Sequence, residues 1–119
     1  MKYEIQKITR IIDVIVDFYM SHQAKKLSMS IEDTEDTYIL IFEAEQIVCS
    51  EKTANGLNKL LSAGRQPEVE EVYWQLGSND VEGDEINLVG MMVDEVKIDY
   101  NCPHLKITLV RNKKKAQPL

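Results

Sequence analysis

The chain has 119 residues, of which 44% are hydrophobic and 29% are charged, and its formal net charge is −6. This composition is typical of one globular domain and excludes a disordered chain or a general nucleic-acid surface, which needs clustered lysine and arginine. No apolar run approaches the roughly 18 residues of a membrane span and no secretion signal opens the chain, so we expect a cytoplasmic protein that does not bind membranes.

The first expected element is a helix over residues 8–22. Its apolar residues recur at helical spacing in two adjoining rows, made of Ile8, Ile12, Ile15 and Tyr19 and of Ile11, Val14 and Phe18. A β-strand over residues 11–16 is the alternative, but the polar residues fit helical spacing better. They form one narrow strip of Arg10, Asp13, Asp17 and Ser21. Carboxylates one turn apart on such a helix need solvation, pairing or ligation, so either Arg10 pairs with Asp13 or the strip is a binding site.

A β-hairpin is expected next. Leu27, Met29 and Ile31 alternate with polar residues, which predicts a half-buried strand, and residues 33–36 supply an acidic turn. The continuously apolar run 38–42 predicts an interior strand that is covered on both faces or nearly so.

Two helices follow. Ser50 is placed to cap a helix whose buried face is Ala54, Leu57 and Leu61 and which ends near Gly64. Pro67 opens the second helix, with Glu68, Glu70 and Glu71 in its first turn. Its buried stripe is expected to be Val69, Val72, Tyr73 and Leu76, and Gly77 ends the helix. Trp74 lies off that stripe, where it either packs at an edge or belongs to a partner surface.

A fourth helix and a second hairpin complete the chain. The helix begins near Asp84 and places Ile86, Val89, Met92 and Val93 on one side, and Gly90 within it indicates close packing against another backbone. Alternation over residues 96–100 and 105–109 predicts the hairpin, with His104 in its turn. No regular structure is expected after Arg111, and Lys113, Lys114 and Lys115 begin a solvated basic tail over residues 113–119. The predicted fold is therefore one α+β domain over residues 1–112, a two-layer α/β sandwich with a mainly antiparallel, mixed sheet covered on one face by helices.

This order of elements resembles the ATPase domain of the GHKL superfamily, which includes histidine kinases and the anti-sigma-factor serine kinases. The resemblance spans about residues 8–111 and is carried by the first helix with LSMSIEDTEDTYILIFEAE and by the closing stretch INLVGMMVDEVKIDYNCPHLKITLVR. It implies the histidine-kinase-like ATPase fold, with ATP and Mg²⁺ as the family's ligands.

The family's N box has a Glu and, four residues later, an Asn that binds Mg²⁺. The resemblance puts Asp13 at the Glu position, as a catalytic base if the protein is active, and Asp17 at the Mg²⁺ position. A carboxylate is an ordinary oxygen ligand for Mg²⁺, so both substitutions are chemically tolerable.

The family's glycine boxes are not retained. Where the family has D-x-G-x-G, this chain has Phe42 to Ile47 with Ala44 at the Asp position. Glu43 or Glu45 could replace that Asp only after a register slip of one residue. The phosphate-binding glycine box corresponds to residues 83–88, where Gly83 matches, Asn87 lies within the stretch, and Asp84 and Glu85 place negative charge near the phosphates. If a nucleotide binds, the candidate residues are therefore Asp17, Glu45, Gly83 and Asn87.

Two functions follow from this pattern. The leading one is a degenerate, non-catalytic regulatory or protein-docking module in bacterial signalling, without a cofactor and with a protein partner or a second copy as its ligand. The alternative is a divergent Mg-ATP-binding protein, an anti-sigma-factor-like serine kinase or an ATPase. An unrelated enzyme has little support, because His22 and His104 lie in no ligand or triad pattern. Cys49 and Cys102 are expected to be free thiols, with Cys49 either a small buried residue or a thiol of lowered pKa at a helix start.

Overall fold

The computed structural model describes residues 4–76 and 85–113. These residues form helices and strands in the following order along the chain: α1 (Glu4–Ser21), β1 (Leu27–Asp33), β2 (Thr37–Ala44), α2 (Glu51–Leu61), α3 (Pro67–Leu76), α4 (Glu85–Gly90), β3 (Glu95–Asn101) and β4 (His104–Asn112).

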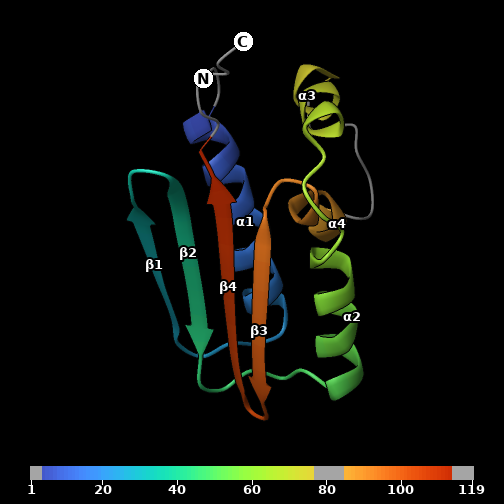
Figure 1. Ribbon diagram of the computed structural model, residues 1–119. Coiled ribbons are helices and arrows are strands. Elements are labelled where there is room, and N and C mark those ends of the chain that lie inside the picture. Colours follow the sequence, from blue (N-terminus) through green and yellow to red (C-terminus); the bar gives the residue numbers. More distant parts are fainter. Residues whose placement is uncertain (1–3, 77–84, 114–119) are drawn as a thin grey trace.

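One sheet runs through the molecule in the order β1-β2-β4-β3 (Figure 1). All three strand pairings are antiparallel, and each hairpin contributes one central strand and one edge strand. Helix α1 lies behind the sheet in Figure 1, and α2 lies beside β3. The α+β two-layer sandwich predicted from the sequence is confirmed.

The two faces of the sheet differ in what covers them. On the helix side, the alternate residues of the central strands are buried, namely Leu40, Phe42, Ala44, Leu105, Ile107, Leu109 and Arg111. On the other face, Ile39 and Ile41 of β2 are only half-buried. The interior position of β2 is confirmed, but helices cover one of its faces rather than both.

Helix α1 packs on the sheet through the rows that the sequence indicated. Ile8, Ile11, Val14 and Ile15 are buried, and the helix ends at Ser21 just before His22. Tyr19 is fully buried, and its hydroxyl lies 2.9 Å from the carbonyl oxygen of Leu105 and 3.2 Å from that of Phe42. Burial raises the pKa of this phenol, so it remains a neutral donor that fixes α1 to both central strands.

Local signals define α2. The side chain of Ser50 accepts a hydrogen bond from the backbone N–H of Thr53 at 3.1 Å, as expected of an N-cap. Ala54, Leu57 and Leu61 are buried, and the chain turns after the helix at Gly64, whose φ is 96°. Glycine occupies this position because the left-handed backbone conformation is unfavourable for residues with a Cβ atom.

Helix α3 begins at Pro67 as expected, but its inward face is different. Val69 is 36% exposed, whereas Glu70 is only 3% exposed. The prediction of a purely apolar inward stripe is wrong at Val69, because buried cations of other elements bind the Glu70 carboxylate. The side chains of Val72, Tyr73, Trp74 and Leu76, and Gly77, lie outside the described residues.

Helix α4 is shorter than its apolar pattern indicated. It ends at Gly90, and Met92 and Val93 are buried in the connection to β3 rather than in the helix. A Cβ atom on Gly90 would overlap the carbonyl oxygen of Leu60 and lie 3.0 Å from two backbone atoms of Leu61. The predicted close approach of Gly90 to another backbone is confirmed, and α2 is that neighbour.

Two predictions at the edge of the domain are wrong. Strand β1 is exposed rather than half-buried, with Met29 51% and Ile31 52% exposed, because it is an edge strand that extends beyond the helical layer. Regular structure also continues past Arg111. Strand β4 reaches Asn112, and Lys113, expected in the solvated tail, forms a 2.5 Å ion pair with Asp33 and lies over the ring of Tyr38.

The two glycines in helices provide a matched test of packing. We expect Gly90→Ala to destabilise the fold by about 1–3 kcal/mol, because backbone atoms cannot move aside as a flexible side chain can. Gly56 is exposed within α2, and a Cβ there would meet nothing within 4 Å. Gly56→Ala should therefore stabilise the protein by about 0.5–1 kcal/mol. Urea unfolding measures both changes, and equal effects of the two substitutions would contradict the described contact.

Candidate functional site

The polar strip of α1 faces outward. Asp13 and Asp17 are both exposed. Arg10 donates from Nη1 to Oδ2 of Asp13 at 3.1 Å, so the predicted Arg10–Asp13 pair is confirmed. The other end of the same guanidinium forms an ion pair with Glu85, in the first turn of α4. Arg10 therefore connects two carboxylates, one on each helix.

The remaining candidate residues do not join this group. Asn87 is half-buried on α4, and its carbonyl oxygen accepts the Met91 N–H at 3.2 Å. Glu45 follows β2 and lines a hollow to which neither α1 nor α4 contributes a residue. Gly83 lies outside the described residues. Of the candidates that are described, only Asp13, Asp17 and Asn87 belong to neighbouring helices.

Mg²⁺ requires oxygen ligands, and a nucleotide requires a site for its phosphate groups. Across residues 4–76 and 85–113, no group of three or more His, Cys, Asp or Glu side chains is placed to hold a metal ion. Asp13 is engaged by a cation, and the carboxylate of Glu85 occupies the first turn of α4. Phosphate oxygens at that turn would meet the negative charge of Glu85, which opposes their binding.

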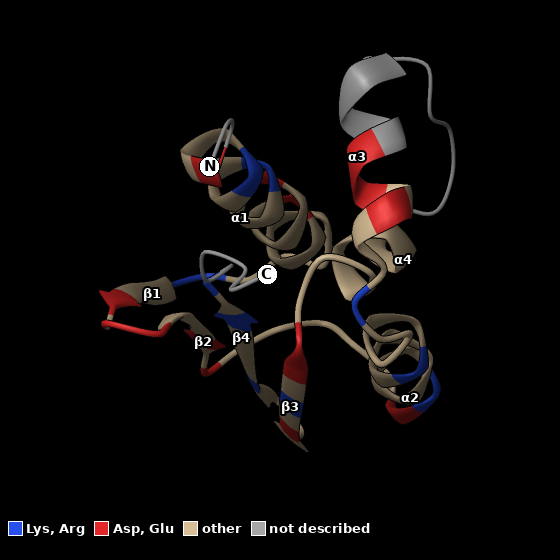
Figure 2. Ribbon diagram, turned by 45° about the horizontal axis from the view of Figure 1, so that its top comes forward, with Lys and Arg blue, Asp and Glu red and all other residues tan. Residues whose placement is uncertain are grey.

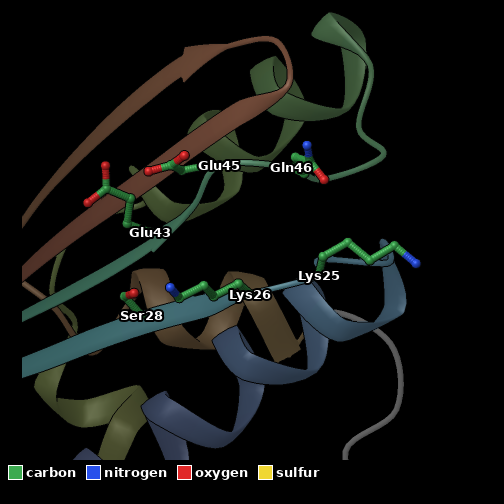
Figure 3. Close-up of a pocket in the computed structure, with 6 residues that line it drawn as sticks. All are labelled: Lys25, Lys26, Ser28, Glu43, Glu45 and Gln46. Carbon is green, nitrogen blue, oxygen red and sulfur yellow. The ribbon is translucent and has the colours of Figure 1, made fainter.

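A hollow of about 340 Å³ lies at the open end of the β1–β2 hairpin, where β1 begins and β2 ends (Figure 3). Its lining is polar and carries both signs of charge, and it consists of Lys25, Lys26, Ser28, Glu43, Glu45 and Gln46. Figure 3 shows the lysines on the β1 side and the glutamates on the β2 side. Such a lining suits polar or zwitterionic groups and offers little apolar surface to a drug-sized ligand.

Glu43 also forms a pair that the sequence did not reveal. Its Oε2 lies 2.6 Å from Nε2 of His104, at the start of β4. This hydrogen bond lowers the pKa of Glu43 below its usual value. The strand register explains the pair, because Glu43 lies opposite Lys106 and His104 lies two residues before Lys106 on the same face. His104 was predicted as a turn residue, and its link to Glu43 becomes visible only once that register is known.

A second group of charged side chains lies elsewhere in the fold. It consists of Glu4, Lys7, Arg65, Glu70 and Arg111, and we call it the buried charge cluster. Arg111 is fully buried and donates to both oxygens of Glu70, at 3.1 and 2.8 Å, and to both oxygens of Glu4, at 2.8 and 3.0 Å. Lys7 is 1% exposed and donates to Glu70 Oε2 at 2.8 Å. Arg65 donates to the other oxygen of Glu70 at 3.2 Å.

The pKa values of Glu4, Lys7, Glu70 and Arg111 are each shifted in the direction that favours the charged form. Burial would raise the pKa of Glu70, but its hydrogen bonds from Arg111 and Lys7 outweigh burial and lower it to about 2. Burial would likewise lower the pKa of Lys7, yet Glu70 and Glu71 raise it. Perturbed groups mark either active sites or structural ion pairs. Here each charge is bound by its opposite inside the fold, so the cluster is structural.

The chain matches no protein-family model, no curated protein sequence and no solved structure. In the described part of the chain, no helix is both long enough and apolar enough to cross a bilayer. Cys49 is half-buried and Cys102 is exposed, and both are free thiols. Burial raises the pKa of Cys49, so the alternative of a lowered thiol pKa at this position is wrong.

The buried charge cluster predicts a loss of stability in acid. The pKa of Glu70 is depressed in the folded state, so its contribution is complete above the unfolded value of 4.5 and is lost as the pH falls towards about 2. We expect this group alone to contribute on the order of 3 kcal/mol. Urea unfolding of wild type and Glu70→Gln across this range measures the contribution as the difference between their pH slopes. Parallel slopes would contradict it.

Proposed function

We propose that this chain is a non-catalytic protein-docking module of the histidine-kinase-like ATPase fold, with a regulatory role in signalling. The observation that supports this proposal is the Arg10 bridge between Asp13 on α1 and Glu85 on α4. The family resemblance places the metal and the phosphates between these two helices. In this chain Arg10 lies between these helices and binds both Asp13 and Glu85.

Apolar surface elsewhere supports the docking role. Met29 and Ile31 of β1, Ile5 of α1 and Val48 after β2 are all more than half exposed. Met29 and Ile31 lie on β1, the free edge strand, and Ile5 lies on α1, the helix next to it. Exposed apolar groups mark interaction surfaces when they gather on one side of a protein. We therefore place the docking surface on β1 and the adjoining flank of α1.

The alternative function is binding of Mg-ATP through Asp17, with Asp13 as a base. One observation favours it: Asp17 is exposed on the outer face of α1, so its carboxylate is accessible to a metal ion. Against it, Asp13 is already paired with Arg10 at 3.1 Å.

Calorimetric titration with Mg-ATP distinguishes the two functions. We expect no saturable heat, because the bridge and the acidic first turn of α4 exclude phosphate groups. Asp17→Ala is the matched variant, and we expect its titration to be indistinguishable from that of wild type. Saturable binding in the low micromolar range that is lost in Asp17→Ala would overturn the docking proposal and establish the alternative.

A further inference from the structure

We propose that the partner of the docking surface is a second copy of this chain, joined by antiparallel pairing of β1 with β1 of the partner. This inference rests on the proposed docking function and names its partner. The pairing would join two four-stranded sheets into one continuous sheet around a two-fold axis perpendicular to it. The helical layers of both copies then lie on the same side.

The two edges of the sheet are built differently, and only one is suited to strand addition. Edge strand β3 carries Glu95, Lys97 and Asp99 on its open face and contacts α2 on its other face. Edge strand β1 reads LSMSIED, with no proline, glycine or lysine, and it pairs with β2 in one continuous register without a bulge. Natural edge strands are normally protected from pairing by such devices. Strand β1 lacks them over its first five residues.

The exposed apolar surface lies at this unprotected edge. Met29 and Ile31 lie opposite Phe42 and Leu40, which are buried, so they continue the core layer beyond the cover of α1. On α1, Ile5, Ile12 and Val16 share one flank at helical spacing, opposite to Lys7 and Arg10.

That flank of α1 faces the β1 side of the molecule. Lys7 and Arg10 bind residues of α3 and α4, and α4 also contacts α2, which lies against β3. The opposite flank is therefore turned to the free edge, as Figure 2 shows with α1 between β1 and α4. Ile5 is 74% exposed there. A second copy would cover both the strand and this flank.

The sequence of β1 is complementary to itself in the antiparallel direction. When Met29 lies opposite the partner's Met29, Leu27 lies opposite the partner's Ile31, on the helix side. Ser28 then lies opposite the partner's Ser30, on the open face. Since directly opposed residues of antiparallel strands share a face, apolar side chains meet apolar ones and serines meet serines.

The same register also pairs charges. Lys26, immediately before β1, lies opposite the partner's Glu32, and the two-fold axis repeats this pair at the other end of the strands. Neither Lys26 nor Glu32 forms an ion pair with another residue among those described, whereas Asp33 is already bound by Lys113 at 2.5 Å.

Other registers lose this match. A shift of one residue sets apolar against polar side chains and puts the two helical layers on opposite sides. A shift of two residues in either direction removes the Lys26–Glu32 pair. The register centred on Met29 satisfies both the apolar and the charged positions, and this agreement identifies a second copy of the chain as the occupant.

Charge reversal tests the register directly. Lys26→Glu places two carboxylates opposite each other at both ends, and Glu32→Lys does the same with two ammonium groups. Sedimentation equilibrium over the micromolar range should show a concentration-dependent dimer for wild type, weakened at least about tenfold in each single variant. Both positions are exposed, so neither change should disturb the fold, and the circular dichroism spectra should be unchanged.

Two samples in which dimerisation should be restored distinguish specific pairing of Lys26 with Glu32 from a general effect of charge. The double variant Lys26→Glu/Glu32→Lys restores opposite charges and should dimerise like wild type. An equimolar mixture of the two single variants should form a heterodimer for the same reason. Recovery in neither case would overturn the proposed register.

A cross-link tests the position of the axis. In a chain with Cys49→Ser and Cys102→Ser, Met29→Cys lies opposite its own copy and should form an intermolecular disulfide on mild oxidation. Ile31→Cys, opposite the partner's Leu27, is the control and should not cross-link. A wild-type chain that is monomeric at all concentrations would overturn the dimer and leave docking to a different protein standing. Mg-ATP binding would overturn the docking function without affecting any of these readouts.

Discussion

The guanidinium of Arg111 connects the last strand to the first and third helices. It lies on the helix-side face of the sheet, fully buried, where an unpaired charge would carry a large desolvation cost. Glu4 and Glu70 compensate that charge with two hydrogen bonds each, and the carbonyl oxygen of Met92 accepts another at 2.7 Å. Removing one member of such a group leaves the others buried without compensation, so these elements hold one another in place.

This constraint explains the orientation of α3. A helix with an apolar stripe would normally turn that stripe to the core. Here Glu70 is directed inward to Arg111, Lys7 and Arg65, and Val69 is turned towards solvent in consequence. Charge pairing through Glu70 therefore contributes to the position of α3. The helix and the sheet are joined by directional bonds, which specify one arrangement more narrowly than apolar packing does.

Much of the fold could be predicted from the sequence because its signals are local. The Ser50 cap, the Pro67 helix start and the alternation of both hairpins each depend on a few neighbouring residues. The close approach of Gly90 to the backbone of α2 could also be predicted, because glycine destabilises a helix and is usually found within one where another backbone packs closely. The exposure of β1 was not readable. Alternation shows which residues share a face, but the strand order decides whether helices cover that face.

In the candidate site too, contacts between neighbours in the sequence could be predicted and contacts between distant residues could not. The Arg10–Asp13 pair lies within one helical turn and was anticipated. Arg10 with Glu85, Glu43 with His104 and Glu70 with Arg111 join residues that are 75, 61 and 41 positions apart, and no spacing rule reaches so far. The sequence placed Arg10 on the first helix and Glu85 near the start of the fourth, yet it could not show that these two side chains form an ion pair.

The buried charge cluster also bears on folding during synthesis. Glu4 is synthesised before Arg111, which lies 107 positions later in the chain. Until β4 has been synthesised, the Glu4 carboxylate of α1 lacks the Arg111 guanidinium that binds it, and the central strand position between β2 and β3 is empty. The final packing of α1 on the sheet therefore requires the chain to be synthesised through β4.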